Sequence, residues 1–194
     1  MQALLLCALA LSLPQRPAKP IVILHTTLGD ITAELEPAKA PETTKNFLRY
    51  VDAGHYTNAR FHRTVTMDNQ PDNKVKIEVI QGGVSEEMSK QDFPPIQLER
   101  TNKTGLKHLD GTLSMARNGP DTATSDFFIC IGAQPELDYG GKRNPDGQGF
   151  AAFGRVVNGM DVVRKIQKQP AKGQTLTPPI TIESIVRKGI RAGF

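Results

Sequence analysis

The feature that most constrains the fold is a series of short β-branched or alternating stretches separated by turn residues. In the first of them, the β-branched segment 21–27 and the alternating segment 31–35 flank the turn Leu28-Gly29-Asp30, which predicts a hairpin. Further strands are expected over 60–63, 75–81, 113–116, 127–131, 150–157 and 180–185. Many short strands favour a closed antiparallel barrel, because closure leaves no unpaired sheet edge.

Helical periodicity occurs at only two places, one near each end of the chain. The first helix is expected to begin at Pro41, where the missing N–H costs nothing, and to end at Gly54. The second is expected to begin at 158–161 and to end at Pro170. Polar surface loops are predicted over 66–74, 85–107 and 139–149. A chain of 194 residues with no break in composition predicts a single domain, over residues 21–194.

Charge and cysteine content argue against several classes of function. The net charge of +4 is mild, and no aromatic residues interleave with the basic clusters, so we expect no nucleic-acid partner. The cysteines, Cys7 and Cys130, and the histidines show no metal-ligand spacing, so no metal and no cofactor are expected. Cys130 is predicted to be a small buried apolar residue.

Residues 1–20 are expected to form a signal peptide followed by a Pro-rich spacer. The apolar stretch 1–13 is too short to span a bilayer, and Pro14, Pro17 and Pro20 stop any helix. Cleavage after the Ala8-Leu9-Ala10 motif and cleavage near Ala18 both remain open, as does lipidation at Cys7. The sequence therefore predicts a periplasmic or secreted protein, with an uncleaved cytoplasmic start as the alternative.

The segments Arg60-Phe61-His62-Arg63 and Val79-Ile80-Gln81-Gly82-Gly83 predict a binding groove. Because residues i and i+2 of a strand share a face, Phe61 and Arg63 are expected to point one way and His62 the other. In the second segment Val79 and Gln81 share a face. Pairing the two strands would place a guanidinium, an amide and an aliphatic floor on one surface, which suits a small apolar group carrying a carbonyl.

Together with 111–119 and 125–130, these segments resemble the cyclophilins, a family of peptidyl-prolyl cis/trans isomerases, over residues 21 to about 185. The resemblance implies a mainly β fold, an eight-stranded antiparallel barrel capped at its ends by two α-helices. It also implies that the substrate binds on the outer wall, because side chains fill the barrel interior.

Under the resemblance, Arg63 is the catalytic residue. The substrate-binding residues are then His62, Val79, Gln81, Ala116, Arg117, Asp126, Phe128, Leu137 and Phe150. Val79, Phe128 and Leu137 would form the proline pocket, and Ala116 would offer backbone groups to the peptide. Taken singly, Arg63 could instead form a surface salt bridge, Gln81 could cap a strand, and the apolar residues could be core.

The chemistry suits an arginine. Rotation about a peptide bond faces a barrier of about 18–20 kcal/mol, and X-Pro exchange takes roughly tens to hundreds of seconds. A permanent cation that donates to the twisted prolyl amide lowers this barrier without a nucleophile or metal. His62 is expected to be a packed, hydrogen-bonded residue rather than an acid or base, because no Ser or Cys partner has a supporting motif.

Several positions depart from the family pattern. Glu136 stands where many members have Trp, Phe150 replaces a His or Tyr, and Arg117 and Asp126 replace more usual amides or a Glu. These departures motivate an alternative function, a module that binds proline-containing segments with little turnover. A basic nucleic-acid scaffold ranks last. The expected partners are proline-containing polypeptides and unfolded client proteins, with no membrane contact beyond a signal sequence, and we expect a monomer.

Overall fold

The predicted N-terminal hairpin is formed by β1 (Ile21–Thr26) and β2 (Gly29–Leu35), which pair in antiparallel register. A computed structural model describes residues 19–189 of the chain, in which seven further strands follow. They are β3 (Ala59–Val65), β4 (Val79–Gly83), β5 (Thr112–Met115), β6 (Phe127–Cys130), β7 (Ala151–Asn158), β8 (Ala171–Lys172) and β9 (Thr175–Arg187).

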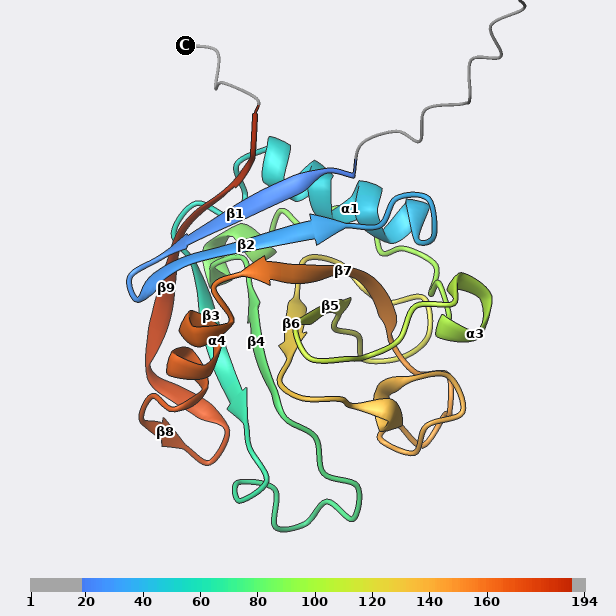
Figure 1. The fold of residues 1–194 in the computed structure, drawn as a ribbon. Helices are drawn as coiled ribbons and strands as arrows, with labels where there is room; N and C mark the ends of the chain where they lie inside the picture. The colour runs from blue at the N-terminus through green and yellow to red at the C-terminus, as the bar shows by residue number, and fades with distance from the viewer. Residues whose placement is uncertain (1–18, 190–194) are drawn as a thin grey trace, which may run out of the picture.

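The strands close into an antiparallel barrel, shown in Figure 1. The order around the barrel is β1-β2-β7-β5-β6-β4-β3-β9, and the β1–β9 pairing closes it. The short β8 lies outside and pairs with β9 alone. The prediction of eight barrel strands is therefore confirmed. β8 gave no sequence signal, because two exposed residues carry no periodicity.

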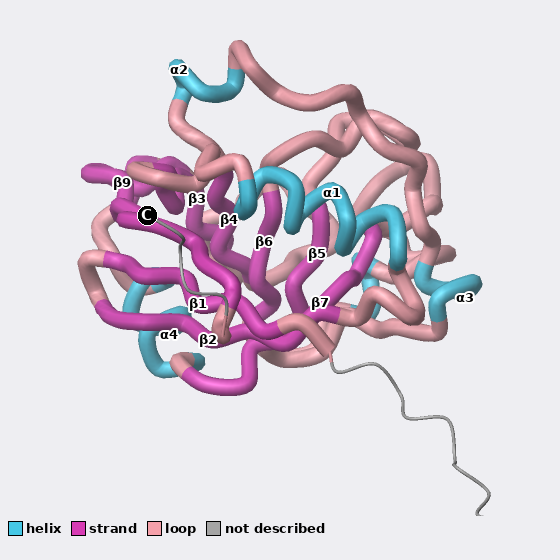
Figure 2. The backbone as a smooth tube through the Cα atoms, turned by 90° about the horizontal axis from the view of Figure 1, so that it is seen from above, coloured by secondary structure: helices cyan, strands magenta, loops and turns pink. Residues whose placement is uncertain are grey.

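The two predicted helices are α1 (Pro41–Asp52) and α4 (Met160–Gln167), and they lie on different sides of the barrel (Figure 2). Two single-turn helices, α2 (Glu86–Ser89) and α3 (Thr101–Thr104), interrupt the segment that was expected to be irregular throughout. Elements of one turn have no apolar stripe, so the sequence could not show them. No helix within residues 19–189 has the length and apolar character needed to cross a membrane.

The barrel strands bury side chains on both faces. An inner core fills the barrel, and its centre is an aromatic cluster of Phe47, Tyr56, Phe61, Phe127 and Phe153. A smaller outer cluster lies on the other face of β4 and β6. It consists of Val65, Ile77, Val79, Phe128, Cys130 and Leu137, with Ala116 and Phe150 packed against it. Cys130 is completely buried there, as predicted.

The predicted orientation of β3 is wrong at Arg63. A β-bulge lies between Phe61, which pairs with Gly82, and Arg63, which pairs with Gln81. The extra residue breaks the alternation of the strand. Phe61 therefore points into the inner core while Arg63 lies on the outer face beside Gln81, and the two do not share a face. His62 is not turned away from the site either, because its Nε2 lies 3.5 Å from the carboxylate of Asp126.

Strand limits also differ from expectation. β4 begins at Val79 rather than at residue 75, because residues 66–78 form one long loop. β9 is longer than the predicted 180–185 and begins at Thr175. The expected signal peptide falls almost entirely on residues 1–18, outside the described part of the chain.

Candidate functional site

An open groove of about 480 Å³ lies on the outer face of the barrel, over the outer cluster. Every predicted site residue except His62 lines it. The lining residues are Arg63, Asn73, Ile77, Val79, Gln81, Ala116, Arg117, Asn118, Thr122, Thr124, Asp126, Phe128, Leu137, Arg143, Asn144 and Phe150. Strands β3, β4 and β6 supply its floor, and the segment 116–126 and the loops 66–78 and 139–149 supply further walls.

The guanidinium of Arg63 is held by two neutral amides. Its Nη1 donates to Gln81 Oε1 at 2.9 Å, while Nε and Nη2 donate to Gln174 Oε1 at 2.9 and 2.6 Å. These bonds use three of the five N–H groups of an arginine and leave two for a ligand. Within residues 19–189 no carboxylate lies within 4 Å of it. Burial lowers the pKa of Arg63, because the side chain is partly removed from water. The charge is therefore oriented without being neutralised.

Gln81 links Arg63 to the partly exposed carboxylate of Asp126. Its Nε2 donates to Asp126 Oδ2 at 2.9 Å, which fixes the amide so that its oxygen faces Arg63. Asp126 comes so close to β4 that a Cβ on Gly83 would meet its Oδ1 at 1.8 Å, so only glycine fits there. Burial raises the pKa of Asp126, although the Gln81 bond and the nearby His62 oppose that shift.

The apolar part of the groove is a pocket of rigid side chains. Phe128 packs edge-on to Phe150 with ring centroids 5.3 Å apart, and Val79 and Leu137 complete the wall. His108 stacks against Phe128 at 6.0 Å with the ring planes 16° apart. The pocket therefore has an aromatic wall held from behind by a buried imidazole.

His108 belongs to a hydrogen-bonded chain that has the residue types of a hydrolase triad. Its Nδ1 lies 2.7 Å from Asp138 Oδ1, and its Nε2 lies 2.9 Å from Ser114 Oγ. Because a carboxylate only accepts hydrogen bonds, Nδ1 of His108 donates to Asp138. Ser114 has no exposed surface and His108 is 1% exposed, so no substrate reaches the hydroxyl. These hydrogen-bonded residues support the Phe128 wall and do not form a nucleophilic site.

Ala116 and Arg117 are more constrained than the sequence indicated. The N–H of Ala116 already donates to the carbonyl of Asp126, so of its two backbone polar groups only the C=O is left for a peptide. The guanidinium of Arg117 binds both carboxylate oxygens of Asp146 and the carbonyl of Gly149, using most of its donors. Arg117 thus fastens the 139–149 loop to the barrel while lining the groove.

Two further residues that the sequence did not predict are important for the site: Gln174, which holds Arg63, and Arg143, which lines the groove. Gln174 precedes β9, and its contact with Arg63 spans 111 positions in the chain, so no local pattern could reveal it. Arg143 lies in the 139–149 loop, where the sequence shows only turn signals. Its position beside the groove depends on how that loop folds back, which spacing does not specify.

Within residues 19–189 no three His, Cys, Asp or Glu side chains are grouped so that they could hold a metal ion. The thiol of Cys130 is buried and its pKa is raised by desolvation, which makes it a poor ligand and nucleophile.

A closed barrel with an open groove, an apolar pocket and an unneutralised guanidinium on its outer wall defines a class of β-barrel protein with an external ligand-binding site. Comparison with known proteins specifies the class. Residues 21–187 match the model of the family described as cyclophilin type peptidyl-prolyl cis-trans isomerase. The chain thus belongs to this family, and its activity is that of a peptidyl-prolyl cis-trans isomerase.

Curated relatives agree with the family model. Peptidyl-prolyl cis-trans isomerase cyp18 of Streptomyces antibioticus is 38% identical over 84% of this chain and 95% of its own length. Peptidyl-prolyl cis-trans isomerase B of Escherichia coli is 39% identical over 76% of this chain and 84% of its own.

Solved structures agree with the fold. The crystal structure of a Cryptosporidium parvum cyclophilin-type isomerase superposes with a TM-score of 0.70 at 25% identity, covering 89% of this chain and 99% of that one. A second structure of the same protein, determined in the presence of the dipeptide Ala-Pro, gives a TM-score of 0.68.

Proposed function

We propose that Arg63 performs the isomerisation by donating hydrogen bonds to an X-Pro amide while that amide is twisted out of plane. A twisted amide loses conjugation, so its nitrogen regains a lone pair that an N–H group can bind. A planar amide offers that lone pair much less. An interaction that strengthens only in the twisted state lowers the barrier, whereas one made equally in both planar states does not.

One observation carries this proposal: the guanidinium of Arg63 is oriented by Gln81 and Gln174, neither of which cancels its charge. A carboxylate in either place would stabilise the cation before the substrate arrived and weaken its pull on the amide. The neighbouring Phe128 wall can hold the proline ring while the preceding residue rotates.

We assign proline-containing segments of unfolded polypeptides as the substrates. An open groove on the outer wall admits a chain that enters at one end and leaves at the other, whereas a closed cavity would admit only a terminus. The related Cryptosporidium parvum protein, crystallised in the presence of Ala-Pro, supports this choice of ligand.

The mechanism is tested by NMR exchange spectroscopy of a short X-Pro peptide. Replacing Arg63 by Ala should lower kcat/KM by about 10²–10³-fold, the usual effect of losing one preorganised donor. Arg60→Ala is the matched control, because Arg60 lies on the same strand, does not line the groove and pairs only loosely with Glu86 at 3.7 Å. Arg63→Ala with the activity of the parent would overturn the proposal.

A second proposal concerns the compartment. The apolar stretch 1–13 followed by Pro14, Pro17 and Pro20 supports export, so the enzyme would assist the folding of periplasmic or secreted proteins. N-terminal sequencing of the protein from fractionated cells tests this. A new N-terminus near Ala10 or Ala18 in the exported fraction is expected, and an intact Met1 in the cytoplasmic fraction alone would contradict it.

A further inference from the structure

The groove contains a second guanidinium that the isomerisation chemistry does not use. Arg143 of the 139–149 loop lines it together with Arg63. Within residues 19–189 no carboxylate lies within 4 Å of Arg143, as is also true of Arg63. Two partly buried cations that lie near one another repel when no anion pairs with them. This arrangement therefore favours the binding of an anionic ligand in the groove.

Arg143 is held in place from behind. Its Nη1 donates to Gln70 Oε1 at 2.8 Å and to the carbonyl of Val75 at 2.7 Å, and Gln70 itself is 1% exposed. Its Nε and Nη2 have no acceptor in the described part of the chain, which leaves three N–H groups for a ligand. The 66–78 loop thus supports the side chain without neutralising it.

The balance of charge around the groove also favours an anionic ligand. Three arginines and one carboxylate line it, and the one carboxylate, Asp126, already accepts from Gln81. Arg117 is neutralised by Asp146, so Arg63 and Arg143 supply the excess positive charge. Burial and the charge of Arg63 both lower the pKa of Arg143. Asp68 and Asp72 of the 66–78 loop do not line the groove.

We propose that Arg143 is a specificity-determining residue, selecting X-Pro substrates that carry an Asp or Glu side chain within two residues of the proline. This inference rests on the proposed assignment of proline-containing segments as substrates and names the preferred class among them. A carboxylate can accept two parallel N–H bonds from a guanidinium, and its negative charge strengthens both of them. An amide of the same shape carries no charge, so its interaction with the guanidinium is weaker.

The experiment compares end-capped peptides that differ only in Glu, Gln or Lys at each position flanking one proline, with exchange followed by NMR. At low salt the parent should show a kcat/KM for its best Glu peptide about tenfold above that of the matching Gln peptide, as for one hydrogen bond to a charged group. The Lys peptide should be the poorest. The Glu-to-Gln ratio should fall as ionic strength rises towards 1 M.

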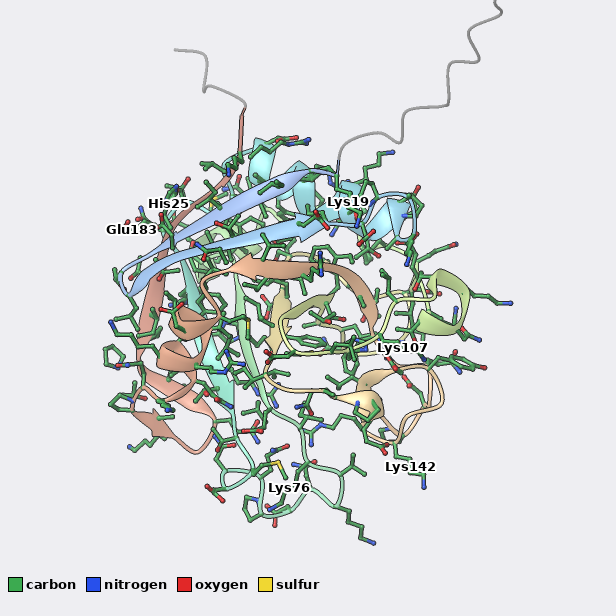
Figure 3. The ribbon with its side chains drawn as sticks, in the orientation of Figure 1. Lys19, His25, Lys76, Lys107, Lys142 and Glu183 are labelled. Carbon is green, nitrogen blue, oxygen red and sulfur yellow. The ribbon has the colours of Figure 1, made fainter. Side chains whose placement is uncertain are left out.

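The variant Arg143→Gln should bring the Glu-to-Gln ratio to about one. Using a ratio cancels any general loss of activity that follows from loosening the loop. Lys142→Gln is the matched control, since it removes the same charge from the neighbouring position, where the side chain is exposed and outside the groove. Lys76→Gln serves likewise on the other loop. Figure 3 shows both lysines on these loops. Each control should keep the parent ratio.

The outcomes separate the two proposals. A parent that accelerates the neutral Gln peptide but shows no preference for Glu overturns the inference and leaves the isomerase function intact. A preference that survives in Arg143→Gln also overturns it, because the selecting charge must then lie elsewhere. If no peptide is accelerated, the proposed function fails and the inference fails with it.

Discussion

The two faces of strands β4, β5 and β6 make different contributions to the same molecule. On the inner face Ile80, Leu113 and Phe127 are completely buried in the barrel core. On the outer face Gln81, Ser114 and Phe128 build and support the groove. Neighbouring residues of one strand therefore serve stability and function separately. Residues of the groove can therefore be substituted while the barrel stays folded, provided that the residues of the inner face are kept.

The largest effect is expected from breaking this division at Phe127 and Phe128. Phe127 packs edge-on against Phe47 and Tyr56, with centroids 5.4 and 5.7 Å away. Phe127→Ala should therefore lower the free energy of unfolding by about 3–5 kcal/mol. Phe128→Ala should lower it less, since its side chain borders the open groove, but should reduce kcat/KM more than tenfold. Denaturant unfolding and peptide exchange, measured on both variants, test this prediction. Equal losses of stability in the two variants would contradict the proposed division between the faces.

Asp138 tests the buried hydrogen bonds that support the outer face, because it bonds to His108 behind Phe128. Burial tends to raise its pKa, but the hydrogen bond and charge of His108, with Lys107, bring the pKa below the usual value. A carboxylate with a lowered pKa stabilises the folded state above the unfolded pKa, and this stabilisation is lost as the pH falls through the folded pKa. Asp138→Asn should cost about 2 kcal/mol at pH 7.

The difference in free energy of unfolding between the parent and Asp138→Asn should narrow at acid pH, as the pH falls below the ordinary carboxylate pKa and through the lowered pKa of the folded state. Unfolding by urea at pH 7 and at pH 3 measures it. Asp30→Asn is the control, because Asp30 is 59% exposed and pairs only with His25, so its effect should stay small at both values. A gap that is constant with pH would show that the charge of Asp138 is unimportant.

The smallest effect is expected at Gln174, which touches the outer face only. Gln174→Ala removes the acceptor of two Arg63 donors but keeps the backbone bond from Thr64 N–H to the Gln174 carbonyl. We expect about a tenfold loss in kcat, roughly 1.4 kcal/mol, with KM and the melting temperature nearly unchanged. Gln169→Ala is the control, since Gln169 bonds only within its own segment. A change confined to KM would mean that Gln174 binds substrate instead of positioning Arg63.

Much of the barrel was predictable, because strand and helix periods are local properties of the chain. The hairpin of β1 and β2 and the limits of α1 and α4 followed from alternation, turn residues and apolar spacing. The two faces of β6 were less clear, since all four of its residues are apolar and buried. Periodicity cannot tell inner from outer in such a strand.

The residue types of the groove were determined by the sequence alone: an arginine, a glutamine and a set of apolar side chains on separated short strands. Tertiary structure decided their orientation. Only the pairing of β3 with β4 and β9 creates the bulge that brings Arg63 out to Gln81. Only chain folding places Gln174 against Arg63 and Arg143 at the groove, over separations at which the sequence carries no geometric information. A local pattern specifies which face a residue prefers, whereas a bulge or a long-range hydrogen bond depends on partners that the pattern does not contain.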